Sequence, residues 1–199
     1  MPEDRLAAAI AAIDEVNAAD PELIDVGGGP RPKELVHSEL MTQFVTALDP
    51  GAGEAQLLAA RAHHLRRWSL PRSNFPSGRA GYLQWRSTLR RQHAEETGAI
   101  LSGVGYEESI IERVQAIILK HGLGAQPPDP QVQVHEDALC LVFLVTQLDA
   151  VAARLGDERT ESIVLKSLAK MSQAGQEAAL DIDLSHRGRR LLDHALAAI

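Results

Sequence analysis

The spacing of apolar residues restricts this chain to a helical fold. Apolar side chains recur three, four and seven residues apart along almost its whole length, and β-branched residues never alternate over a run long enough for a convincing strand. In the segment 33–48, His37, Leu40, Phe44 and Leu48 step along one helix face, which places His37 on a buried stripe. We therefore predict an all-α protein.

Proline and glycine mark the ends of the predicted helices. With 199 residues, the length suits one domain, 1–199, which ends in a C-terminal helical extension over 156–199. The segment 69–81 is too rich in Pro and Gly to be helical throughout. Helices are predicted over about 6–16, 33–48, 53–68, 82–101, 107–121 and 131–155, followed by two or three shorter ones.

Charge is distributed unevenly along the chain. The net charge is −7, but the segment 61–94 holds eight arginines and no Asp, Glu or Lys, so it carries +8 against −15 for the remainder. It also contains four of the seven aromatic residues, including both tryptophans. We call 61–94 the arginine segment.

An arginine-rich, aromatic segment suits an anionic ligand, because the guanidinium fork matches phosphate and stacks on aromatic rings. The alternative is that these arginines pair with acids elsewhere. Arg90 and Arg91 are expected to be solvated or salt-bridged, and Lys120 to be an ordinary helix charge. The predicted substrate-binding residues are Arg66, Arg67, Arg72, Arg79, Arg86 and Tyr82.

Several of the eight histidines stand on apolar helices or beside acids. Imidazole and carboxylate are suitable ligands for a divalent metal, and helices can supply them across a bundle core. Neither H-E-x-x-H nor C-x-x-C occurs, and buried hydrogen-bonded histidines would give the same pattern. The candidates are His37, the pair His63-His64, His93, His121 and the run His135-Glu136-Asp137.

The order of these residues resembles the HD-domain superfamily of metal-dependent phosphohydrolases over 33–150, the predicted HD-like core. The most persuasive stretch is HAEETGAILSGVGYEESIIERVQAIILKHG, which begins at His93 and contains His121. The phrases HHLRRWSLPR, FPSGRAGYLQWR, EDALCLVFL and LAKMSQAG further resemble an uncharacterised family of bacterial and fungal helical proteins, described as a domain of unknown function.

The HD resemblance implies metal ligands position by position. His37 and His63 match histidine ligands, while His64 stands where the superfamily has aspartate, which removes a negative charge from the site. Asp137, or its neighbour Glu136, matches the final carboxylate. The implied ligands are His37, His63, His64 and Asp137, with His93 and His121 as further candidates.

These residues predict a metal-dependent hydrolase acting on a nucleotide-like or other phosphorylated small molecule. His64 would ligate or orient water, Glu136 would accept a proton, and the divalent ion would be Mn, Fe, Co, Ni or Zn. Two alternatives remain: a non-catalytic HD-like module that recognises RNA or an anionic ligand, and an iron-dependent HD-fold oxygenase.

Composition limits the compartment and the partners. The single cysteine, Cys140, cannot form an intrachain disulfide, and the N-terminus lacks a basic start and an apolar run. The most apolar stretch, 138–145, is far shorter than the roughly 20 residues of a membrane span. We predict a cytoplasmic protein without a membrane contact. Extensive nucleic-acid binding is disfavoured by the −15 remainder, and the oligomeric state stays open.

Overall fold

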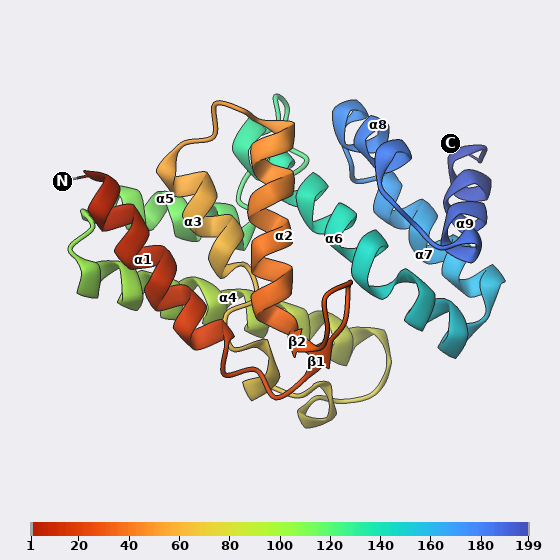
Figure 1. Ribbon diagram of the computed structural model, residues 1–199, viewed down its shortest axis with the longest axis horizontal. Helices are drawn as coiled ribbons and strands as arrows, with labels where there is room; N and C mark the ends of the chain where they lie inside the picture. Colours follow the sequence, from red (N-terminus) through yellow and green to blue (C-terminus); the bar gives the residue numbers. More distant parts are fainter. Residues whose placement is uncertain (1, 199) are drawn as a thin grey trace.

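The computed structural model describes residues 2–198 and confirms the all-α prediction (Figure 1). One short antiparallel pair, β1 (Leu23–Ile24) with β2 (Arg31–Pro32), was not predicted. Two 3-10 turns follow α3, η1 (Arg67–Ser69) and η2 (Arg72–Asn74). The helices are α1 (Pro2–Asn17), α2 (Lys33–Leu48), α3 (Glu54–Ala62), α4 (Gly78–Val104), α5 (Glu108–Leu119), α6 (Pro130–Leu155), α7 (Asp157–Leu168), α8 (Gln173–Asp181) and α9 (His186–Leu196).

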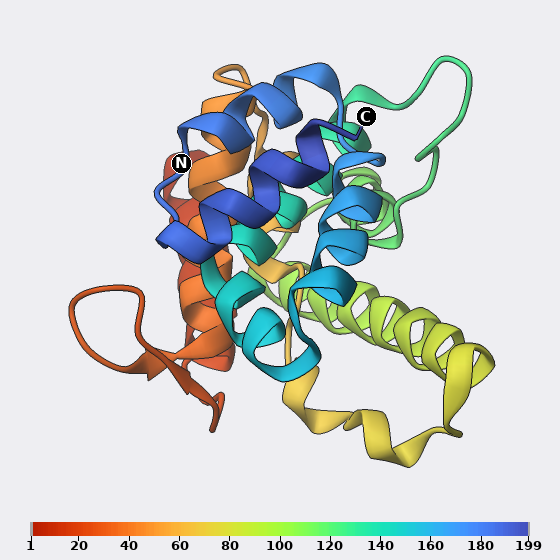
Figure 2. The same ribbon diagram turned by 90° about the vertical axis from the view of Figure 1, so that its right-hand side faces the viewer.

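Helix α6 lies between the two halves of the molecule (Figures 1 and 2). It packs on α2, α3 and α5 toward the N-terminal half and on α7, α8 and α9 toward the C-terminal half. Val132, Leu141 and Ala138 of this helix each belong to a different one of the three buried hydrophobic clusters. The helix therefore joins the predicted core to the C-terminal extension through continuous apolar packing.

The N-terminus of α6 is fixed by Asp129. Its side chain accepts hydrogen bonds from the backbone N–H groups of Gln131 and Val132, and Pro130 occupies the first helical turn, where its missing N–H costs nothing. Arg113 of α5 donates to both Asp129 carboxylate oxygens at 2.7 and 2.8 Å. The cap thus also ties α5 to α6.

Among the described helices, α6 alone is long and apolar enough to cross a bilayer by length and composition. It also carries three buried polar side chains in a row, His135, Glu136 and Asp137. It packs against six other helices, as the central helix of a bundle does.

The third helix is shorter than predicted, ending at Ala62 instead of near position 68. The His63 ring bonds the carbonyl of Ala60, and Arg66 adopts a left-handed backbone with φ of 51°, so the chain leaves the helix axis there. Helix α4 begins at Gly78, earlier than the predicted 82. Residues 63 to 66 consequently form a turn that presents two adjacent histidines together.

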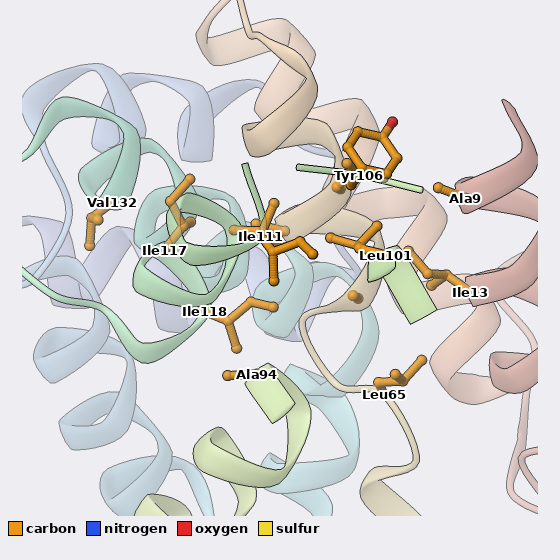
Figure 3. Close-up of a cluster of buried hydrophobic side chains, with 14 residues drawn as sticks. Ala9, Ile13, Leu65, Ala94, Leu101, Tyr106, Ile111, Ile117, Ile118 and Val132 are labelled. Atoms are coloured by element: carbon orange, nitrogen blue, oxygen red, sulfur yellow. The ribbon is translucent and has the colours of Figure 1, made fainter. Parts of the chain in front are cut away.

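The largest N-terminal cluster holds this turn in place (Figure 3). Leu65, which follows His64, and Ala94, which follows His93, are both buried in it. Ile118 of α5 belongs to the same cluster. The histidine-bearing segments are therefore anchored by apolar neighbours.

Helix α8 packs closely against α6 at Gly175. A Cβ atom built there would lie 2.7 Å from Cγ and 2.9 Å from Cβ of Asp137, whose side chain is buried. Only glycine at this position permits the observed packing, because the opposing atoms belong to a short, constrained side chain.

Gly175→Ala is expected to destabilise the protein by about 2 kcal/mol, the usual cost of overpacking a well-filled contact. Urea unfolding measures the change. Gly103→Ala in α4 is the control, because nothing lies within 4 Å of its Cβ position and alanine favours the helix. Equal stability of the two variants would contradict the packing argument.

Candidate metal centre and adjoining cavity

Four potential metal ligands converge in the N-terminal half. Glu34 and His37 come from the first turns of α2, and His63 and His64 come from the turn after α3. One ligand atom from each lies within 4.8 Å of the others. Ligand atoms around a tetrahedral zinc-like ion with bonds of about 2.1 Å are about 3.4 Å apart, so side-chain shifts of up to roughly an ångström would close the set on an ion.

The start of α2 is positioned by a buried aspartate from the preceding loop. Asp20 accepts from the backbone N–H of Glu34 at 3.0 Å and from that of Glu22 at 2.9 Å. Pro32 at the N-cap offers no side-chain acceptor, so Asp20 supplies the missing cap. Glu34 and His37, three residues apart, then project from the same helix face.

Glu34 links the two segments. Its side chain is 3% exposed, and its Oε2 lies 3.2 Å from Nδ1 of His64 and 3.3 Å from Nδ1 of His37. Arg67 Nε lies 3.9 Å from the other oxygen. A buried carboxylate requires such partners, because its desolvation is otherwise very unfavourable.

The tautomers of His63 and His93 follow from their backbone contacts. Nδ1 of His63 lies 3.0 Å from the Ala60 carbonyl, and Nδ1 of His93 lies 2.7 Å from the Leu65 carbonyl. A carbonyl only accepts, so Nδ1 carries the proton in both rings. In the neutral form each Nε2 therefore carries a free lone pair, and both atoms are buried without a hydrogen-bond partner among residues 2–198. This is the state in which imidazole ligates a metal.

Burial keeps these imidazoles neutral. Desolvation lowers the pKa of His64 to about 3 and that of His93 to about 4, and it lowers the pKa of His63 well below its usual value. Desolvation also lowers the pKa of His135 to about 3, with Lys120 acting in the same direction. Four uncharged rings at neutral pH leave ligand nitrogens free of competing protons.

A small cavity of about 40 Å³ adjoins the cluster. Four histidines contribute to its wall, namely His63, His64, His93 and His135. Four cations also contribute, namely Arg67, Arg86, Arg90 and Lys120. Within residues 2–198, no Asp or Glu lines it. The cavity is suited to a small anion.

Two of these arginines are oriented by aromatic rings of α4. The Arg67 guanidinium lies 4.9 Å from the centroid of Trp85, and that of Arg86 lies 5.8 Å from the centroid of Tyr82. Trp85 in turn donates its indole N–H to the Leu70 carbonyl at 2.9 Å. The aromatic residues of the arginine segment thus hold the cationic wall.

A family model matches the chain over residues 7–192. That model is described as a domain of unknown function, DUF4202. The chain belongs to this family. Among curated proteins and solved structures, the comparisons found no match. The match confirms the resemblance carried by the four phrases, and the HD-domain resemblance stays a prediction.

In this DUF4202 protein only part of the predicted substrate-binding set reaches the cavity. Arg67 and Arg86 line it. Arg72 instead donates to the carbonyls of Phe75, Pro76 and Gly78, folding its own loop. Of the rest, Arg66 is exposed and lies 3.6 Å from Glu96, while Arg79 and Tyr82 are exposed.

Asp137 lies outside the metal cluster. Its carboxylate accepts from the backbone N–H and hydroxyl of Ser172 and from the Gln133 amide, at 2.9, 2.5 and 2.9 Å. These bonds fasten the start of α8 to α6. Asp137, predicted as a metal ligand, therefore serves to hold two helices together. Glu34 supplies the carboxylate of the cluster in its place.

The remaining predicted site residues divide between the cavity and other places. His93 lines the cavity, although it is not one of the four converging ligands, whereas His121 is exposed after α5. Glu136 is buried in an ion pair with Lys120, and its second oxygen lies 3.8 Å from Nζ of Lys170.

Sequence reasoning missed three residues of the site, Glu34, Arg90 and Lys120. Glu34 and His37 form a Glu-x-x-His spacing on one helix, a signal that the sequence does contain. His135 was a candidate but entered no predicted ligand set, Arg90 was expected to be solvated or salt-bridged, and Lys120 was assigned as an ordinary helix charge. Their roles depend on which face meets the cavity, and helix spacing alone does not show that.

Asp137→Ala is expected to destabilise the protein by roughly 2 kcal/mol, because partly buried donors of Ser172 and Gln133 lose a charged acceptor. Metal content, measured by elemental analysis, should remain unchanged. Asp181→Ala, at an exposed position at the end of α8, serves as the control. Loss of metal with unchanged stability would return Asp137 to the ligand set.

Acid should destabilise the metal-free protein through its buried histidines. His93 has a folded-state pKa of about 4, below the unfolded value, so its contribution is present above about pH 6.5 and is lost as pH falls toward 4. At pH 5 the loss is about 2 kcal/mol for this group. His93→Gln should remove that part of the pH dependence in urea unfolding with a chelator, and His121→Gln should not.

Proposed function

We propose that this protein is a metal-dependent hydrolase that acts on a phosphorylated small molecule. The observation that carries the proposal is the convergence of Glu34, His37, His63 and His64 beside a cavity lined by four cations. The first feature is suited to a divalent metal and the second to an anion. Their adjacency is what a phosphoryl-transfer site requires.

The donor set favours a transition metal. Three imidazoles and one carboxylate suit Zn, Fe, Co, Ni or Mn better than Mg or Ca, which prefer oxygen ligands. Glu34 also restores the negative charge that His64 lacks relative to the HD pattern. Bound there, the ion would polarise a phosphoryl oxygen and lower the pKa of an attacking water.

The protein groups around the cavity suit the remaining tasks. Arg67 and Arg86, with Arg90, would neutralise charge that develops on the phosphoryl oxygens. Among residues 2–198 the unprotonated Nε2 of His93 has no hydrogen-bond partner, and it would accept a hydrogen bond from a water in the cavity and orient it. Glu136, held by Lys120, is less suited to the proton-acceptor role predicted for it.

The size of the cavity limits what enters it. About 40 Å³ is room for roughly three waters, which is comparable to the oxygens of one phosphoryl group. The remainder of a nucleotide-like substrate would therefore lie outside, against the exposed surface near Tyr82.

Glu34→Gln should lower metal occupancy and hydrolysis of a phosphomonoester panel at least tenfold, because the only carboxylate of the cluster loses its charge. Elemental analysis and phosphate release measure the two effects. Glu39→Gln on the same helix is the control, since Glu39 pairs with Arg31 at the surface. A wild-type protein with neither bound metal nor activity would refute the proposal.

The same experiments separate the alternatives. If the double variant His63→Ala/His64→Ala loses metal but keeps its affinity for an anionic ligand or RNA, the binding-module function is supported instead. Two iron ions per chain after anaerobic purification would support the oxygenase.

A further inference from the structure

We propose that Lys120 is a substrate ligand, a buried ammonium group that leaves Glu136 to bind an oxygen of a phosphate-class anion in the cavity. The inference rests on the proposed function for the identity of the substrate. It assigns a role to a residue that the metal centre does not use.

The backbone at Lys120 is the first indication. Lys120 ends α5 with φ of 61°, in the left-handed region that glycine adopts freely and side-chain-bearing residues rarely adopt. A lysine in this conformation costs backbone free energy, and such strain is commonly found where the side chain has a functional role. That side chain is directed inward, 8% exposed, and it lines the cavity.

The charges around Lys120 are the second indication. Glu136 is shared by two ammonium groups, Lys120 in direct contact and Lys170 at 3.8 Å. Within the described part of the chain, Arg86 and Arg90 have no carboxylate partner, although both line the same cavity. Positive charge thus exceeds negative charge here by several units, and an anion would balance it.

The third indication is a set of unsatisfied polar atoms facing the same region. Nε2 of His63, Nε2 of His93 and Nδ1 of His135 are buried without hydrogen-bond partners in residues 2–198. Buried polar atoms usually have a hydrogen-bond partner, so we expect a ligand in the cavity to form hydrogen bonds with these nitrogens. An anion with hydroxyl character, such as hydrogen phosphate, offers both acceptors for the cations and a donor for a lone pair.

Lys170 makes the exchange of partners feasible. When Lys120 turns to the anion, Glu136 keeps Lys170 as a counter-ion and is not left buried with an unpaired charge. Burial lowers the pKa of Lys120, and a bound anion would favour its protonated form.

The test measures binding of inorganic phosphate to the chelator-treated full chain by isothermal titration calorimetry. Lys120→Gly suits the backbone conformation, and we expect it to weaken phosphate binding at least tenfold while circular dichroism shows an unchanged fold. Glu136→Gln removes the competing carboxylate and should tighten binding several-fold. Lys166→Ala, exposed on α7, is the matched control and should change nothing.

Equal phosphate affinity of wild type and Lys120→Gly, or no phosphate binding by the wild type, overturns the inference. If Lys120→Gly does not fold, Lys120→Asn, which also tolerates this backbone, takes its place. Lys120→Arg should retain most of the phosphate affinity. If Lys120 served only to pair with Glu136, the phosphate affinity would not depend on whether residue 120 carries a positive charge.

Metal content distinguishes this inference from the proposed function. Phosphate binding that depends on Lys120 in a protein without metal affinity would refute the hydrolase and retain the anion site. Metal binding with phosphate affinity indifferent to Lys120 would refute the Lys120 role alone.

Discussion

A buried carboxylate, Glu34, imposes the central constraint on this structure. At 3% exposure it must be surrounded by donors, and they come from two separate segments, His37 on its own helix and His64 with Arg67 after α3. This requirement brings the end of α3 against the start of α2. The turn that breaks α3 at Ala62 is what allows His63 and His64 to reach the same point.

The histidines and the cations of the site depend on each other through burial. Neutral imidazoles tolerate a low-dielectric environment and provide lone pairs, whereas arginine remains charged there and requires an anion or an aromatic face. Trp85 and Tyr82 supply such faces for Arg67 and Arg86. The site therefore keeps arginines next to neutral imidazoles that could ligate a metal, with Glu34 as the carboxylate of the cluster.

Much of the fold was predictable because apolar periodicity reports directly on helices. The segment 33–48 was predicted at its observed bounds, and His63 and His64, both predicted as metal ligands, lie in the cluster that could hold a metal ion. Other features were not predictable in this way. Asp137 has the residue type and neighbours of a ligand, yet Ser172, which is 35 positions away, satisfies it.

The sequence by itself determined that the chain is helical, that eight arginines without any Asp, Glu or Lys are concentrated in 61–94, and which residue types were available for a metal. Tertiary structure decided which of them meet. It selected Glu34 over Asp137, retained Arg67 and Arg86 for the cavity, and added Lys120. The reason is that ligand sets and cavities are made by contacts between segments distant in sequence, whereas periodicity describes only how each helix orients its own side chains.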